Sequence, residues 1–105
     1  MKIGELRHRV TIQGLVRVPD GFGGYSEIWQ DKARIWASIE PLRGQELYFA
    51  RQTLQQVTHR VVLRYIRGIT RGMRIVWGER VLKILAVIDR GRTYGWLELM
   101  CEEVV

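Results

Sequence analysis

The chain has 105 residues, of which 47% are hydrophobic and 27% charged, so it is neither a disordered tail nor a low-complexity segment and should fold as one domain over residues 1–105. Its 17 Lys and Arg outnumber its 11 Asp and Glu, and the net charge of +6 favours acidic partners or nucleic acid. One cysteine and two histidines exclude an internal disulfide and leave too few ligands for a structural zinc site.

The first predicted element is a strand, because apolar and polar residues alternate through ELRHRVTIQ. Its apolar face carries Leu6, His8, Val10 and Ile12. In residues 14–26, Pro19, Asp20 and several glycines supply turn chemistry over a stretch too long for a tight hairpin. We predict a flexible, exposed loop over residues 14–26, because the segment has little apolar surface to offset the entropy cost of ordering.

A second strand is predicted through IWQDKARIWASIE, and it ends near Glu40 because Pro41 lacks a backbone donor. The apolar period then changes to that of a helix. The apolar positions at helical spacing are Leu47, Ala50, Leu54 and Val57. Residues 43–59 are therefore predicted to insert one short helix between the second and third strands. An isolated helix of about 12 to 15 residues is marginal in water, so a surface helix and an extended arm both remain open.

Five arginines between residues 60 and 74 have the spacing of a helical stripe, but the residues between them indicate strands. Most of these are β-branched or aromatic, and Gly68 and Gly72 interrupt them; each interior glycine costs a helix roughly 1 kcal/mol. THRVVLRYI, a hairpin of MRIVW with RVLKILAVID, and WLELMCEE complete the predicted strands. The predicted fold class is mainly β, a small antiparallel β-barrel or sandwich of five to six strands with one short helix.

The sequence offers no constellation of catalytic residues, so we expect neither an enzyme nor a cofactor or metal. His8 and His59 are isolated, and Cys101 alternates with Leu97 and Leu99, as a buried small hydrophobic residue does. A lone cysteine suits a reducing compartment such as the cytoplasm. No stretch reaches the roughly 20 apolar residues of a membrane span, so we expect no membrane partner.

Aromatic residues interleaved with arginines leave a second kind of function open. A basic β-barrel with exposed rings can bind single-stranded nucleic acid, because bases stack on the rings and phosphates lie in a basic groove. Four aromatics fall inside apolar runs, where large rings usually belong to the core. They are Trp36, Tyr65, Trp77 and Trp96. We expect these four in the core and keep single-strand binding as the alternative function.

The ordered motifs of the chain resemble the bacteriophage head-closure family, whose members are also called head-tail joining, adaptor or stopper proteins. The resemblance rests on GELRHRVTIQ, GFGG before EIW, WASIEPLRGQE, RYIRGIT, MRIVW, ILAVID and LELMCEE, in that order. It spans nearly the whole chain. The fold implied is a small β-barrel with a mobile insertion, and residues 43–59 occupy the position of that insertion.

The resemblance implies a structural protein of the virion neck, which is in the host cytoplasm during assembly. Similar proteins form a ring beneath the portal and adaptor rings, close the DNA-filled head and bind tail-completion proteins. Their insertion faces the ring's channel, which holds packaged double-stranded DNA. Candidate channel or interface residues are Arg43, Glu46, Arg51, Gln52, Gln55, Gln56, Arg64 and Arg67. Strand arginines are expected to pair across subunits with Glu40, Glu46 or Glu79, or to face the channel.

Overall fold

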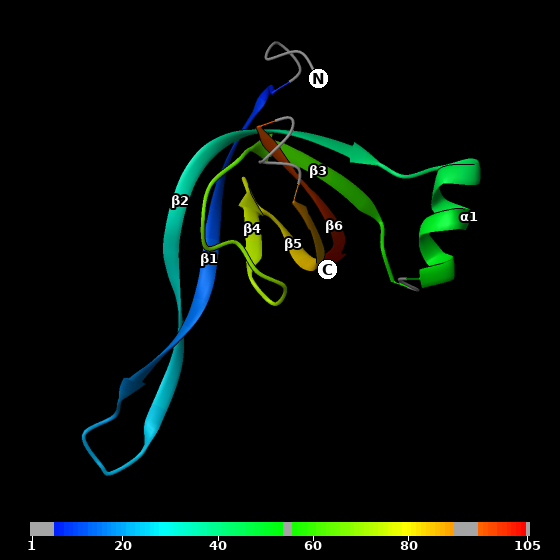
Figure 1. The fold of residues 1–105 in the computed structure, drawn as a ribbon. Helices are drawn as coiled ribbons and strands as arrows, with labels where there is room; N and C mark the ends of the chain where they lie inside the picture. The colour runs from blue at the N-terminus through cyan, green and yellow to red at the C-terminus, as the bar shows by residue number, and fades with distance from the viewer. Residues whose placement is uncertain (1–5, 54–55, 90–94, 105) are drawn as a thin grey trace.

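The computed structural model describes residues 6–53, 56–89 and 95–104, in which six antiparallel strands close into one barrel (Figure 1). The strands are β1 (His8–Pro19), β2 (Tyr25–Pro41), β3 (His59–Arg64), β4 (Arg74–Trp77), β5 (Arg80–Asp89) and β6 (Trp96–Val104), and the helix α1 (Gly44–Thr53) lies between β2 and β3. The order around the barrel is β1-β2-β3-β6-β5-β4, and β4 pairs with β1 to close it. The predicted fold class is confirmed, with a barrel rather than a sandwich.

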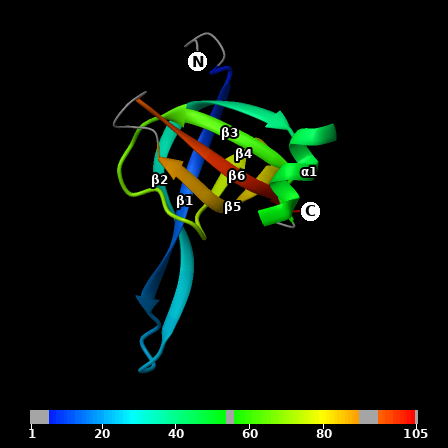
Figure 2. The same ribbon diagram turned by 45° about the vertical axis from the view of Figure 1, so that its right-hand side comes forward.

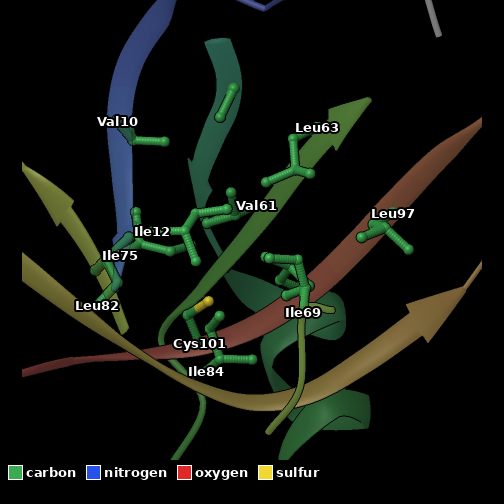
Figure 3. Close-up of a cluster of buried hydrophobic side chains, with 12 residues drawn as sticks. Val10, Ile12, Val61, Leu63, Ile69, Ile75, Leu82, Ile84, Leu97 and Cys101 are labelled. Atoms are coloured by element: carbon green, nitrogen blue, oxygen red, sulfur yellow. The ribbon is translucent and has the colours of Figure 1, made fainter. Parts of the chain in front are cut away.

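The core lies inside the barrel and receives side chains from every strand, because alternate residues of a strand point to the same face (Figure 3). Its buried members are Val10, Ile12, Ala37, Val61, Leu63, Ile69, Ile75, Leu82, Ile84, Leu97, Leu99 and Cys101. Burying one large aliphatic side chain contributes about 1.5–3 kcal/mol, so this cluster is the main source of the barrel's stability. Cys101 is fully buried, as its alternation with Leu97 and Leu99 predicted.

The predicted loop over residues 14–26 is wrong for most of its length. β1 continues to Pro19 and β2 begins at Tyr25, so a turn of residues 20–24 joins two long paired strands. The strand continues because Val16 and Val18 keep the alternation of the apolar face, and pairing satisfies backbone groups that a loop would leave to water. The mobility of this segment in solution stays a prediction.

The helix between β2 and β3 is confirmed, but it is shorter than the predicted segment 43–59. α1 has ten residues and ends at Thr53. Val57 is fully buried, yet it lies beyond the helix in the segment that leads into β3. Leu54 lies outside the described residues. The four apolar positions therefore do not form one helical stripe, because the last of them packs where the chain returns to the barrel.

The expectation that four aromatic residues lie in the core is wrong for two of them. The exposed fractions are 48% for Trp36 and 42% for Tyr65, whereas Trp77 is partly buried against the core and Trp96 is half-buried. Trp36 points outward because its neighbour Ala37 points into the barrel. A run of apolar residues on both faces of a strand conceals which of them faces solvent.

Candidate functional site

The eight residues predicted to face a channel or an interface fall into two groups that the fold keeps apart. Those on or beside α1 are Arg43, Glu46, Arg51, Gln52 and Gln56, all exposed, whereas Gln55 lies outside the described residues. Arg64 ends β3 and Arg67 lies in the turn that follows, and both are exposed. The two groups are at opposite ends of β3, a strand of six residues, so about 16 Å of strand separates them.

The first group lies on or beside α1, which stands to one side of the barrel (Figure 1). We call α1 together with residues 43, 56 and 57 the arm. The base of the arm is fixed, because Leu42 and Val57 are buried and the Leu42 N–H donates to the Thr58 carbonyl at 3.0 Å. These contacts extend the pairing of β2 with β3 by one step beyond the strands themselves. The arm therefore leaves the barrel from a rigid origin.

The outer part of the arm carries a pair of exposed aromatic rings. Tyr48 and Phe49 are 63% and 64% exposed, and their rings meet edge to face with centroids 5.5 Å apart. Glu46 in the first turn and Arg51 in the last turn match the helix dipole, which offsets part of the marginal stability of so short a helix. Exposed rings beside charged and amide side chains are typical of a surface that binds another protein.

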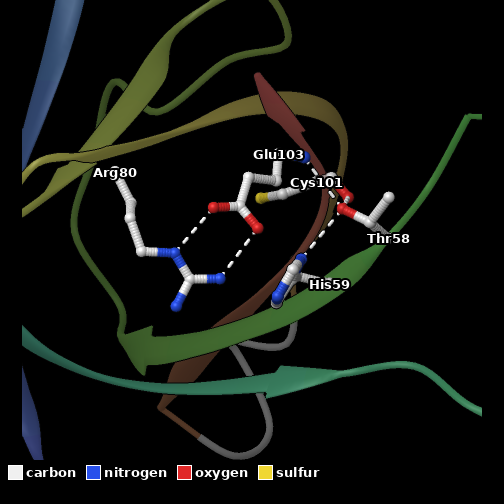
Figure 4. Close-up of polar contacts among 5 residues, drawn as sticks. All are labelled: Thr58, His59, Arg80, Cys101 and Glu103. Atoms are coloured by element: carbon white, nitrogen blue, oxygen red, sulfur yellow. Dashed lines mark hydrogen bonds and ion pairs between the residues drawn. The ribbon is translucent and has the colours of Figure 1, made fainter. Parts of the chain in front are cut away.

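A polar network joins the base of the arm to β6 (Figure 4). The Thr58 hydroxyl lies 2.8 Å from His59 Nδ1 and accepts the backbone N–H of Glu103 at 2.8 Å. Arg80 donates to both carboxylate oxygens of Glu103, at 2.6 and 2.7 Å, and this hydrogen bonding lowers the pKa of Glu103 and raises that of Arg80. Burial lowers the pKa of His59, against the opposing effect of Glu103. These hydrogen bonds connect the start of β3 with β5 and β6 at the base of the arm.

Cys101 is buried, and Glu40 already binds a side chain of its own chain. Burial raises the pKa of the Cys101 thiol to about 12, which excludes a reactive thiolate at neutral pH. Glu40, one of the acids expected to pair across subunits, binds Arg60 of its own chain at 2.9 Å. That hydrogen bond raises the pKa of the Arg60 guanidinium above its usual value.

A second projection is a β-ribbon formed where β1 and β2 leave the barrel (Figures 1 and 2). We call residues 14–31 the distal ribbon. It begins at a β-bulge, because Ile12 pairs with Ala33 but Gln13 pairs with Asp31, which leaves Lys32 as an extra residue on β2. Gly14 leaves room for the Lys32 side chain, whose Cε would come within 2.9 Å of a Cβ at that position.

The distal ribbon exposes a large amount of apolar surface. Its exposed large hydrophobic residues are Leu15, Phe22, Tyr25, Ile28 and Trp29. Phe22 is 94% exposed at the tip, where Asp20 Oδ1 accepts the backbone N–H groups of Phe22 and Gly24 at 2.7 and 3.1 Å and shapes the turn. The prediction of a loop missed this surface. The alternation of Val16 and Val18 with the first strand was the signal that could have revealed it.

Several arginines on the outside of the barrel and ribbon lie over aromatic rings rather than free in solvent. The pairs, with the distance from the guanidinium carbon to the ring centroid, are Arg9 and Trp36 at 5.4 Å, Arg17 and Tyr25 at 4.7 Å, Arg74 and Trp29 at 4.2 Å, and Arg80 and Trp77 at 4.3 Å. Such contacts cover ring faces that a nucleic-acid base would need for stacking. Arg64 lines a shallow apolar hollow with Leu6, Ile35 and Trp36.

Within residues 6–53, 56–89 and 95–104, no three His, Cys, Asp or Glu side chains are grouped so that they could hold a metal ion. In the same part of the chain, no helix has the length and apolar character needed to cross a membrane.

Comparisons with known proteins cover nearly the whole chain. The family model described as phage head completion protein matches residues 1–104. The solution structure of protein SF1141 from Shigella flexneri 2a superposes with a TM-score of 0.79 at 34% identity, covering 98% of this chain and 96% of that one. A chain of the virion of a native gene transfer agent particle superposes with a TM-score of 0.62 at 28% identity, covering 95% and 96%. No curated protein sequence matches significantly.

Proposed function

The chain belongs to the phage head completion protein family, and on that premise we propose that it forms a ring beneath the portal and adaptor, closes the DNA-filled head and provides the surface to which the tail attaches. The family consists of structural virion proteins and is not a class of enzymes, so the chain acts by binding other head and tail proteins. Its place of action is the virion, specifically the neck, after assembly in the host cytoplasm.

The observation that carries this proposal is the family match over residues 1–104, which includes the barrel and both of its projections. The similar chain from a gene transfer agent virion supports it, because that chain is covered over 96% of its length. A barrel with two projections that expose apolar side chains, the arm and the distal ribbon, is suited to a connector. Each projection can contact a different neighbour while the barrel keeps its own core.

The arm is the part we propose to face the channel. It stands off the barrel, and its exposed Gln52 and Gln56 can hydrogen-bond either to neighbouring copies or to DNA phosphates without burying an unpaired charge. Arg43 and Arg51 add positive charge beside the phosphates. An extended state of the same residues, stabilised by contacts available only in the ring, would narrow the channel further.

Arg64 and Arg67 occupy the other end of β3 and serve a different contact in this proposal. Both are exposed, and Arg64 borders the apolar hollow that contains Trp36. Arginine beside an exposed ring is typical of protein interfaces, because the guanidinium group is weakly hydrated and binds carboxylates with two hydrogen bonds. We assign this end of the barrel to an acidic surface on an adjoining ring.

Electron microscopy of the purified protein mixed with the portal and adaptor complex of the same virus tests the proposal. We expect an additional ring on the adaptor side, absent from the portal and adaptor alone. Bovine serum albumin at the same concentration is the control for adventitious density. Failure to bind this complex, with the protein shown to be folded by circular dichroism, would contradict the connector function.

Single-strand nucleic-acid binding is the alternative, and the Arg-aromatic contacts count against it. Trp29 and Trp36 are exposed, but a guanidinium group lies over each ring. A base that stacked on the same ring face would have to displace the arginine. Strong and salt-sensitive binding of short oligonucleotides by the isolated monomer would favour this alternative.

A further inference from the structure

The distal ribbon has two strand edges without a partner in the described chain. β1 pairs with β4 only through residues 11–13, and β2 pairs with β3 only from Ala37 onward. Residues 14–19 of β1 and residues 25–36 of β2 are therefore bonded on one side only. Unpaired N–H and C=O groups along an edge are a template for a further strand.

The two edges are complementary in direction. Within the ribbon, β1 and β2 are antiparallel. When a second ribbon in the same orientation lies alongside, its β1 edge meets the β2 edge of the first, and the new pair is again antiparallel. In each contact one copy uses its β2 edge and the next copy uses its β1 edge. The contact is therefore head-to-tail and can repeat until a ring closes.

The two edges also differ in charge. Arg17 is the charged residue of β1 between residues 14 and 19. The part of β2 within the ribbon, residues 25–31, carries Glu27 and Asp31 on the same face as Arg17, and Lys32 and Arg34 follow nearer the barrel. Arg17 lies over Tyr25 and makes no ion pair with Glu27, the residue opposite to it. A neighbouring β1 edge would bring a positive charge to Glu27 and Asp31 on the outer part of the β2 edge, residues 25–31.

Both faces of the ribbon carry apolar side chains that the ribbon of a second copy could cover. Val16, Val18 and Ile28 continue the inward-facing side of the barrel strands beyond the core, and Ile28 is 48% exposed. Tyr25 and Trp29 lie on the other face. A two-stranded ribbon is marginally stable alone, and adjacent ribbons would cover both sets of side chains along their shared edge.

We propose that the β2 edge of the distal ribbon in one copy pairs with the β1 edge of the ribbon in the next copy, so that the ribbons of a ring form one continuous antiparallel sheet. This inference rests on the ring proposed above. It names the part of the chain that joins neighbouring subunits.

Disulfide trapping between two single-cysteine variants tests the pairing. Val18→Cys places a thiol on β1, and Ser26→Cys, on the same face, places one on β2 of a copy enlarged by a tag. Ile28→Cys and Gln30→Cys scan the register along that face. The native Cys101 is buried, and its raised pKa of about 12 keeps it from competing.

The variants are mixed and oxidised, both alone at high concentration and on the portal and adaptor complex. We expect mixed β1–β2 dimers in several-fold excess over β1–β1 and β2–β2 dimers. The control is Lys83→Cys, an exposed position on β5, whose two neighbours β4 and β6 are both paired within the chain. Mixed dimers no more abundant than those of the control, or a predominance of like-with-like dimers, would overturn the pairing.

A charge exchange between copies provides a second, independent measurement. Arg17→Glu on the Val18→Cys copy should reduce the yield of mixed dimer several-fold, and Glu27→Arg on the Ser26→Cys copy should restore it. No reduction, or no rescue, would contradict the proposed contact between these edges. Because each change sits on a different molecule, rescue cannot come from repair within one ribbon.

The outcome separates the pairing from the proposed function. If microscopy shows the ring on the adaptor but mixed dimers do not form, the connector function stands and the edge pairing is wrong. If mixed dimers form but no ring binds the adaptor, the pairing stands and the connector function is wrong.

Discussion

Gly78 shows how one residue determines a turn of the barrel. Trp77 pairs with Arg80, so Gly78 and Glu79 form a two-residue loop between β4 and β5. The φ angle of Gly78 is 60°, whereas Glu79 has no positive φ, as a type II′ turn requires. We expect Gly78→Ala to destabilise the fold by about 1–3 kcal/mol, because a side chain is strained in this conformation.

Urea unfolding monitored by tryptophan fluorescence measures that loss. Glu79→Ala is the matched control, since the neighbouring residue is exposed and has an ordinary backbone conformation. Its effect should stay within about 0.5 kcal/mol, as is usual for surface substitutions. Equal losses in the two variants would contradict the assignment of strain to Gly78.

His59 should make stability depend on pH in the near-neutral range. Burial lowers its pKa in the folded state below the unfolded value of about 6.5, so the unfolded chain binds the extra proton more readily. The stabilising contribution is complete above the unfolded pKa and is lost as the pH falls through that value toward the lowered folded pKa. We expect the urea midpoint to decline between about pH 7.5 and about pH 5.5, where carboxylates remain ionised.

The control for this prediction is His59→Gln, which removes the titrating ring and keeps a polar side chain beside Thr58. Its midpoint should be lower but should vary less over the same range of pH. Glu103 contributes in a separate, more acidic window, because its pKa is lowered and its stabilisation is lost only as the carboxylate is protonated. An unchanged pH slope in His59→Gln would show that another group is responsible.

Among the described side chains of the helix α1, none belongs to the buried core cluster, so its surface residues can be changed without disturbing the core. Replacing Gln52 and Gln55 by alanine should change the free energy of unfolding by less than about 0.5 kcal/mol, because Gln52 is exposed on a helix that stands off the barrel. In particles, the same change should cause filled heads to lose DNA, if the arm closes the channel. DNA content of purified heads and plaque counts measure this.

Thr70→Ala, on the exposed turn before β4, is a control that alters a polar surface residue outside the arm. It should leave DNA retention unchanged. Particles with the glutamine changes that keep their DNA and infect normally would exclude the arm from channel closure.

The mobility predicted for residues 14–26 should be greatest in the turn and along the free edges of the distal ribbon. We expect amides in the turn, residues 20–24, and those along its two free edges to exchange with solvent faster than amides inside the barrel, because no third strand protects them. Hydrogen exchange followed by NMR makes the comparison. Exchange as slow as that of residues 61–63 in β3 would show that the ribbon is rigid in the isolated chain.

At the scale of the whole molecule, we expect the isolated protein to be largely monomeric at micromolar concentration. Closing the barrel already buries the core within each copy, so no core side chain needs a second copy to cover it. Each copy also carries a net charge of +6, which opposes self-association until acidic partners or DNA compensate it. Sedimentation velocity would contradict this expectation if it showed a stable ring without partners. Raising the salt concentration in the same experiment separates charge repulsion from a lack of contact.

Sequence alone determined the class of fold and the identity of most core strands. The alternation through Val10 and Ile12, and through Leu97, Leu99 and Cys101, has a period of two and specifies which face is buried. The helix between β2 and β3 followed from a change of period after Pro41. These signals are local, so they survive without knowledge of what each strand contacts.

Only the tertiary structure decided where the strands end and which side chains remain for partners. Glycines near residue 20 read as a loop, yet β1 pairs with β2 from His8 to Pro19 because each strand supplies the other's hydrogen bonds. Trp36 reads as core, yet the barrel interior is already filled by aliphatic side chains from other strands. Pairing and filling of the interior depend on residues distant in the sequence. The free edges of the distal ribbon also depend on distant residues, because they begin where pairing with β4 and β3 stops.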